Sequence, residues 1–378
     1  MRDSFAIATA LLVTTALIGG VAGTAAGAQP TISTDGPAAD AHPTAGAGAA
    51  VGAAGAPTAA GSPEATADPA QTGDACGFPL NATDATGETV TLEERPERIT
   101  TLNPSAAQTL WELGERDRVV GVSRFASYLD GAEERANVSA EFGASVERVV
   151  DTDPDLVLAP NASAADVEPL REQGLTVYHF PAATSVDDIA EKTETTGRLV
   201  GACDAAAETN EEMYGAVDAA EERTADLDRP AALYPLDGGY VAGSDTFIDS
   251  IMTVGGTENV AAEIGSGYPQ ASDEVILESN PELIVVTDPE AAILDEEPYA
   301  STTAGAEGNY VVLNANYLSQ PAPRSVIEST TTLSNAVVEL RSEGDESAGG
   351  DTGAEAPGFG VVAAALALLA TGLIARRD

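Results

Sequence analysis

Few side chains in this 378-residue chain could coordinate a metal or act as a nucleophile. It has two histidines, His42 and His179, and two cysteines, Cys76 and Cys203. These numbers exclude a Cys/His zinc cluster. The sequence also lacks a Gly-x-Ser-x-Gly turn, a phosphate-binding loop and a nucleophile paired with a histidine. We therefore expect a protein that binds its ligand without chemistry, and not an enzyme.

Two glutamates recur at matching positions. The segment from Ser145 reads Ser-x-Glu at Glu147, then Pro seven residues later and Leu two residues after that. The segment from Ser272 repeats this pattern around Glu274, offset by 127 residues (274 − 147). A Glu in the first turn of a Ser-capped helix is stabilised by the helix dipole, so capping chemistry alone could explain either residue. Recurrence in both halves favours a surface that contacts one partner.

The elements that must position these residues alternate between strand and helix. Apolar runs and helix-stop signals predict strands at 98–102, 119–122, 155–159, 231–235 and 283–287, with helices ending at Gly114 and spanning 246–254. Continuous apolar strands are typical of parallel sheets. We predict an α/β fold with an N-terminal lobe (76–182), a helical linker (183–229) and a C-terminal lobe (230–340). In the linker, 186–200 and 203–226 form helices, and the second is a long rigid helix that joins the lobes.

The ends of the chain indicate export. Residues 1–28 read as a signal peptide, with an N-terminal membrane anchor as the alternative. Residues 29–75 form a disordered Ala/Gly/Pro tether, and 341–356 an acidic stalk. Residues 357–378 begin with Pro357-Gly358-Phe359, continue as an apolar span and end in two arginines. This end resembles the sorting signal cut by archaeosortases in haloarchaeal surface proteins. An uncleaved membrane helix is the alternative, and both place the body outside the cell.

Charge and modification sites agree with that location. The formal net charge is −44, and Lys192 is the only lysine. This composition excludes nucleic-acid binding through basic patches. An acidic chain with almost no lysine resembles the proteins of extreme halophiles. Cys76 and Cys203 lie in the exported body, where they form either a disulfide or two buried thiols. Three glycosylation sequons begin at Asn81, Asn137 and Asn161.

The motifs of residues 76–340 resemble one family of two-lobed proteins. They include Pro96-Glu-Arg98, Asn103-Pro104-Ser105, Leu113-Gly114, Arg118-Val-Val-Gly121, Val146-Glu147-Arg148, Pro154-Asp-Leu156, Tyr268-Pro269-Gln270 and Pro281-Glu-Leu283. The body is similar to the substrate-binding proteins of ABC importers for cobalamin, ferric siderophores and haem, whose lobes share a long backbone helix. The resemblance implies a monomer, anchored outside the cell, that works with a permease dimer and its ATPase. It also implies that Glu147 and Glu274 pair with permease arginines.

The same resemblance implies a set of ligand contacts. They are Pro104, Ser105, Phe125, Tyr128, Phe142, Tyr240 and Tyr268. Each also reads as an ordinary core or rim residue, and Arg324 either contacts an anionic ligand or caps the last helix. Only His179 lies in the body, and one histidine makes no metal site, so we expect no intrinsic cofactor and a ligand that carries its own chelated metal. Tyrosines suit a corrinoid, and no arginine cluster for a ferric siderophore is evident. Siderophore, haem and a structural surface glycoprotein remain the alternatives.

Overall fold

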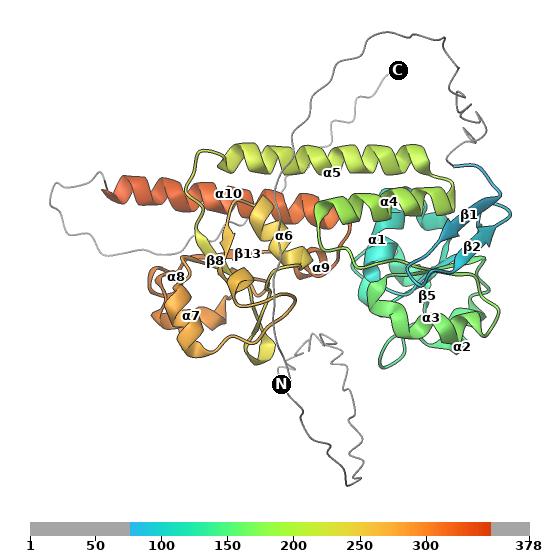
Figure 1. Cartoon of the computed structure of the whole chain (residues 1–378), viewed down its shortest axis with the longest axis horizontal. Helices are drawn as coiled ribbons and strands as arrows, with labels where there is room; N and C mark the ends of the chain where they lie inside the picture. The colour runs from blue at the N-terminus through green and yellow to red at the C-terminus, as the bar shows by residue number, and fades with distance from the viewer. Residues whose placement is uncertain (1–75, 349–378) are drawn as a thin grey trace, which may run out of the picture. The chain divides into compact units, whose positions relative to one another are not determined.

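The computed structural model describes residues 76–348, with side chains to Ser342, and all of these residues belong to one compact unit. They form two α/β lobes, each with one parallel sheet (Figure 1). The predicted fold class is confirmed. The predicted signal peptide, the first tether and the Pro357-Gly358-Phe359 signal lie outside the described residues.

The N-terminal lobe contains a parallel sheet in the order β5-β4-β3-β6-β7. Its strands are β3 (Ile99–Thr101), β4 (Val119–Val122), β5 (Ala136–Asn137), β6 (Leu156–Ala159) and β7 (Val177–His179), and its helices are α1 (Pro104–Glu112), α2 (Val146–Asp151) and α3 (Ala164–Arg171). An antiparallel hairpin, β1 (Leu80–Thr83) and β2 (Thr89–Leu92), precedes the sheet and was not predicted.

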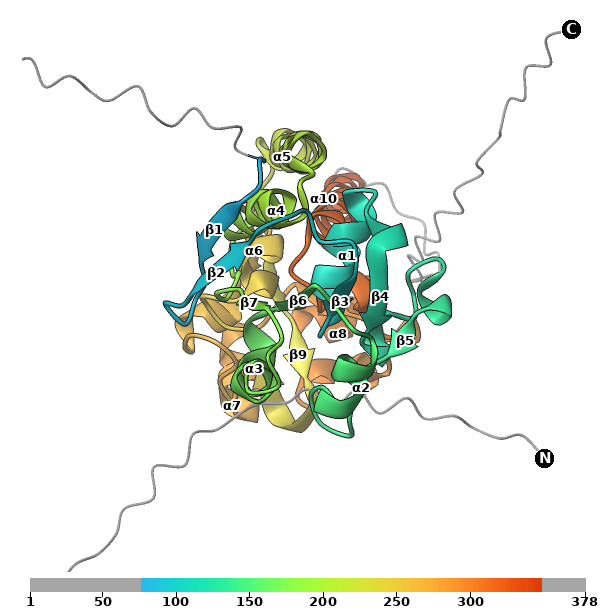
Figure 2. The same ribbon diagram turned by 90° about the vertical axis from the view of Figure 1, so that its right-hand side faces the viewer.

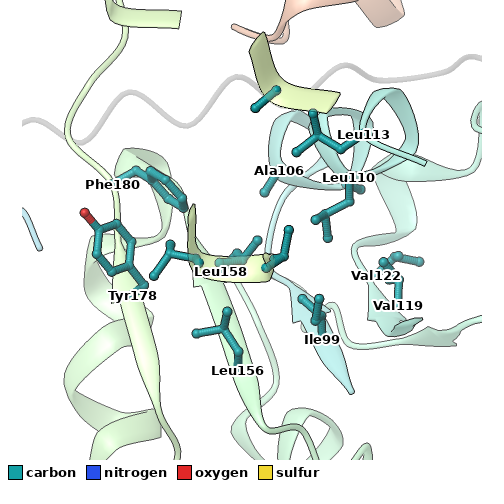
Figure 3. Close-up of a cluster of buried hydrophobic side chains, with 14 of the residues drawn as sticks. Ile99, Ala106, Leu110, Leu113, Val119, Val122, Leu156, Leu158, Tyr178 and Phe180 are labelled. Carbon is teal, nitrogen blue, oxygen red and sulfur yellow. The ribbon is translucent and has the colours of Figure 1, made fainter. Parts of the chain in front are cut away.

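The core of this lobe forms where α1 covers the sheet. Ile99, Leu156 and Leu158 of the strands are fully buried, and Leu110 of α1 packs in the same cluster (Figure 3). Every residue of β6 is buried, as a central strand covered on both faces requires. The sheet therefore holds the loops at its strand ends in fixed positions.

The C-terminal lobe repeats this plan. Its parallel sheet runs β11-β8-β12-β13, the counterparts of β4-β3-β6-β7. The strands are β8 (Ala231–Leu233), β11 (Glu258–Asn259), β12 (Leu283–Val286) and β13 (Tyr310–Val312). Around them lie the short pair β9 (Pro235–Leu236) and β10 (Tyr240–Val241) and the helices α6 (Phe247–Val254), α7 (Asp273–Ser279), α8 (Thr303–Glu307) and α9 (Ala315–Leu318).

The 127-residue repeat extends to backbone detail. Asp153 and Asn280, at equivalent positions, both take the left-handed conformation (φ 45° and 40°) directly before a proline. Two residues further on, Asp155 accepts a backbone hydrogen bond from Arg98, and Glu282 accepts one from Ala231. In each lobe, this carboxylate ties the start of one strand to the neighbouring strand.

Three helices, not the single predicted one, cross between the lobes. They are α4 (Val186–Val200), α5 (Cys203–Thr224) and α10 (Pro323–Ala348). Helix α5 contributes Ala206 to the core of the first lobe and Met213 and Val217 to that of the second. Helix α10 packs along α5 (Figures 1 and 2) and continues to Ala348, so the first eight residues of the predicted stalk are helical. The helical extension was not predicted because residues 341–348 are mostly polar and show no apolar period. Arg, Glu and Ala in this segment nevertheless favour helix.

A disulfide fixes the start of α5. Cys76 and Cys203 are bonded, which confirms one of the two predicted states. Across residues 76–348, no helix is both long and apolar enough to pass through a bilayer.

Candidate functional site

Ligands of parallel α/β sheets bind at the carboxyl ends of the strands. In the N-terminal lobe, Phe125 lies three residues after β4, and Phe142 lies in the loop before α2; they are 56% and 68% exposed. Arg124 links them: its guanidinium lies 4.8 Å from the centre of the Phe125 ring and donates to the carbonyls of Ala140 and Glu141, at 2.8 and 3.0 Å. Two predicted ligand residues therefore share one surface.

Arg124 was not among the predicted site residues. Its position two residues after a predicted strand could have identified it, because that is where the chain leaves the sheet at its ligand-binding edge. The side chain adds a cation to an aromatic surface, where it could contact an anionic group of a ligand.

In the C-terminal lobe, Tyr240 and Tyr268 lie on paired backbone segments. Tyr240 forms an antiparallel bridge with Gln270, and the Val241 amide donates to the Pro269 carbonyl at 3.0 Å. Tyr240 is half-buried, and Tyr268 is 38% exposed; burial raises the pKa of the Tyr268 hydroxyl, which keeps it a neutral hydrogen-bond donor. These two predicted residues also come together.

A small cavity lies at the ends of β8 and β12. It measures about 130 Å³ and is lined by Tyr234, Thr287, Asp288 and neighbouring apolar residues. Burial raises the pKa of Tyr234, so its hydroxyl stays neutral. Pockets for drug-sized ligands are about 300–1,000 Å³. This cavity can therefore hold only one substituent of a larger molecule.

Tyr128 belongs to a polar joint between the lobes. Its hydroxyl donates to Gln108 Oε1 at 2.8 Å, and Gln108 Nε2 donates to Ser325 Oγ of α10 at 3.1 Å. The Tyr128 ring packs edge-on against the Tyr317 ring, with 6.0 Å between their centres. Burial raises the pKa of Tyr128, and Tyr317 and Glu112 add to the shift. The ligand contact predicted for Tyr128 stays a prediction.

Pro104 and Ser105 are buried at the start of α1, and the ligand contacts predicted for them stay predictions. Ser105 is 2% exposed, and its hydroxyl accepts a hydrogen bond from Lys192 Nζ at 2.9 Å. Lys192 also donates to the Pro321 carbonyl at 2.8 Å, just before α10, and desolvation lowers its pKa to about 7. Helix α1 begins at Pro104 because Asn103 caps it, and this turns both residues inward.

Arg324 does not cap α10, and its predicted contact with an anionic ligand stays a prediction. It lies in the first turn of α10, where a cation cannot satisfy the exposed amides, and it pairs with Glu328 one turn later at 3.1 Å. Glu112 and Glu328 raise its pKa further. Burial raises the pKa of Glu112 on α1, although Arg324 opposes that shift. Arg324 therefore contributes to the joint between α1 and α10.

The described residues contain no group of three or more His, Cys, Asp or Glu side chains arranged to hold a metal ion. His179 is the last residue of β7; it is 6% exposed, and its Nδ1 lies 3.0 Å from the Ala159 carbonyl oxygen. It is a buried lobe residue, as predicted.

The remaining predicted sites are on the surface. Glu147 and Glu274 are exposed in the first turns of α2 and α7, behind the N-caps Ser145 and Ser272. The three sequon asparagines, Asn81, Asn137 and Asn161, are exposed as well. No observation tests docking or glycosylation, and both stay predictions.

The chain matches a family model described as "Periplasmic binding protein" over residues 99–317. It is 44% identical over 337 residues to the cobalamin-binding protein of Halobacterium salinarum, covering 80% of this chain and 90% of that protein. It is 25% identical over 261 residues to the vitamin B12-binding protein of Vibrio parahaemolyticus, covering 66% of this chain and 90% of that protein.

Solved structures share the fold. The periplasmic vitamin B12 binding protein of Vibrio cholerae matches with a TM-score of 0.57 and 22% identity, covering 65% of this chain and 98% of that chain. The periplasmic heme-binding protein from Roseiflexus sp. RS-1 matches with a TM-score of 0.59 and 23% identity, over 65% and 98% of the two chains. These identities show that the proteins share a fold. They do not identify the ligand of this chain.

Proposed function

The chain belongs to the periplasmic binding protein family, and from this premise we propose that it is the substrate-binding protein of an ABC importer for a corrinoid. It captures its ligand without chemistry and delivers it to a permease dimer driven by an ATPase. The 44% identity to a cobalamin-binding protein, over most of both chains, carries the proposal.

The aromatic surfaces support a broad, flat ligand. Phe125 and Phe142 present one pair in the first lobe, and Tyr240 and Tyr268 present another in the second. Aromatic faces pack on a corrin ring, and tyrosine hydroxyls reach amide groups at its edge. A pre-chelated cobalt needs no metal ligand from the protein.

Haem is the second candidate. Several solved structures of this fold are those of heme-binding proteins, and the Arg124 guanidinium could pair with a propionate. A corrinoid with its nucleotide phosphate can use the same cation, so Arg124 does not separate the two. A structural surface glycoprotein would account for the exposed sequons, but it gives no reason for family membership.

A role in an ABC importer also implies partner proteins and a location at the membrane. We place Glu147 and Glu274 in contact with permease arginines, one in each lobe. The C-terminal signal, processed by an archaeosortase-type enzyme, would anchor the protein on the outer face of the membrane. Neither proposal concerns ligand capture, so each can fail without affecting it.

A ligand titration of the full chain in molar KCl tests the function. Trp111 is the single tryptophan in the sequence, so its fluorescence serves as the probe of binding. We expect cyanocobalamin to bind more tightly than haem or a ferric hydroxamate, and Tyr240→Ala/Tyr268→Ala to weaken binding at least about tenfold, or 1.4 kcal/mol. Tyr214→Ala on α5 is the matched control, because Tyr214 is also 38% exposed. Tighter binding of haem would overturn the corrinoid proposal.

A further inference from the structure

The C-terminal lobe supplies no basic side chain to its ligand. From Ala231 to Pro323 the sequence contains no Lys, Arg or His. The arginines on either side of this stretch have other partners. Arg229 donates to the Thr253 carbonyl at 2.8 Å, and Arg324 pairs with Glu328 at 3.1 Å. A ligand group that meets this lobe therefore finds hydroxyls, carboxylates and backbone, but no cation from the lobe itself.

The small cavity of this lobe lies where the strand order of its sheet reverses. Within the sheet, β8 is followed by β11 on one side, and β12 is followed by β13 on the other. Open parallel sheets bind ligands at the carboxyl ends of their strands, at such a switch point. Tyr234 and Thr287 come directly after β8 and β12, and both line the cavity. Its position is therefore that of a ligand subsite.

The polar groups of the cavity suit an uncharged group that both donates and accepts hydrogen bonds. The Tyr234 side chain is 7% exposed and stays neutral, and Thr287 adds a second hydroxyl. Asp288, at the exposed side of the cavity, accepts a hydrogen bond from the Glu290 amide at Oδ1, at 3.1 Å. Its Oδ2 has no hydrogen-bond partner among the described residues. Hydroxyls can donate to a carbonyl oxygen and a carboxylate accepts from an N–H, so a carboxamide satisfies both.

The volume of the cavity fits one short arm of a larger ligand. A water molecule takes about 30 Å³ in the liquid, so a cavity of about 130 Å³ has room for about four water-sized groups. A corrin ring carries propionamide arms of this size on its rim, whereas haem carries propionates. A carboxylate in the cavity would face Asp288 without a cation, and an unpaired charge is costly to desolvate. A carboxamide brings no charge.

We propose that this cavity, lined by Tyr234, Thr287 and Asp288, is an arm pocket that admits one propionamide arm of the corrinoid and rejects a carboxylate. Asp288 is its specificity-determining residue. The inference rests on the proposed function and deepens it, because it names the class of corrinoid. The site selects corrinoids with intact amide arms over those with a free acid arm, and over haem.

The opposite polarity of the other lobe agrees with this selection. Arg124 places a cation beside Phe125 in the N-terminal lobe, whereas Asp288 places an anion at the arm pocket. A corrinoid that carries a phosphate on its nucleotide loop and amides on its ring presents both matching groups. In 1 M salt the Debye length is about 3 Å, so the net charge of −44 is screened and contact groups decide.

Equilibrium dialysis of the full chain at 3 M KCl and pH 7 tests the arm pocket. It compares cyanocobalamin with its three monocarboxylic acids, in each of which one propionamide arm has become a carboxylate. We expect one of these acids to bind at least about tenfold more weakly than cyanocobalamin. Asp288→Asn removes the charge and keeps an acceptor for the Glu290 amide, so it should reduce that ratio to about threefold or less. Asp218→Asn, on an exposed position of α5, removes the same charge and should keep the wild-type ratio.

The failures are distinguishable. Equal affinity for cyanocobalamin and all three acids overturns the arm pocket and leaves corrinoid capture in place. Equal weakening of all three acids assigns the effect to general repulsion and also overturns it, as does an Asp288→Asn variant with the wild-type ratio. If cyanocobalamin itself does not bind, or haem binds more tightly, the proposed function is overturned.

Discussion

At the scale of single residues, the most unusual group is Lys192. It is the only lysine in the chain, yet it is 7% exposed and joins Ser105 of α1 to the Pro321 carbonyl before α10. The sequence gave no reason to expect that this lysine would be buried. Burial removes the water that stabilises an ammonium group, and only two neutral oxygens replace it.

Stability should depend on the titration of Lys192. Its pKa is about 7 in the folded protein and near 10.5 when unperturbed. Between these values the unfolded chain holds a proton that the folded protein has released. The free energy of unfolding therefore rises with pH, by at most about 1.4 kcal/mol per unit, and this gain is absent below pH 7. Lys192→Met should remove that slope.

Urea unfolding from pH 7 to 9.5 measures the effect. The range stops below pH 10 because buried tyrosines such as Tyr128, whose pKa is raised, reverse the trend once unfolded tyrosines ionise. Equal slopes for the wild type and the methionine variant would show that Lys192 does not titrate as described.

At the scale of elements, the sequence predicted the central strands β3, β4, β6, β8 and β12, but it missed most of the shorter strands and part of the helical frame. Val119–Val122 and Val186–Val200 have their predicted bounds, because apolar period and stop signals coincide there. The crossing role of α10 could not be read, since a helix of Ser and Thr gives a weak apolar pattern. Likewise, Tyr240 and Tyr268 were predicted as site residues from the family resemblance. The roles of Arg124 and Lys192 could not be predicted, because they depend on contacts with residues distant in sequence.

Close backbone packing positions Tyr268. A Cβ on Gly243 would lie 2.1 Å from the Gly265 carbonyl oxygen, and the Gly243 amide donates to the Gly267 carbonyl at 2.9 Å. Gly243→Ala should displace the segment that carries Tyr268. We expect a loss of about 1–3 kcal/mol in unfolding free energy and weaker corrinoid binding.

Thermal unfolding and ligand titration of the two variants provide the comparison. Gly215→Ala in α5 is the matched control, because nothing lies within 4 Å of its added Cβ. That substitution should be neutral or stabilising by up to about 1 kcal/mol. If Gly243→Ala binds and melts like Gly215→Ala, the 265–269 segment does not depend on this contact.

At the scale of the whole molecule, net charge governs stability. The chain carries a net charge of −44, and repulsion among its carboxylates destabilises the folded state unless salt screens it. The melting temperature should rise steeply between 0.1 and 1 M KCl, where the Debye length falls from about 10 to 3 Å. Calorimetry in KCl and in sucrose separates screening from general exclusion, because sucrose stabilises without carrying charge. An equal rise in both would assign the effect to exclusion.

The three crossing helices also decide what happens when the chain is cut. A break in the 225–230 segment leaves α4 and α5 on one fragment and α10 on the other, and α10 packs along α5. The fragments therefore remain interlocked through a buried helix pair, with the Cys76–Cys203 bond securing the start of α5. A chain nicked there should therefore stay in one piece, because each fragment supplies one helix of the α5–α10 pair.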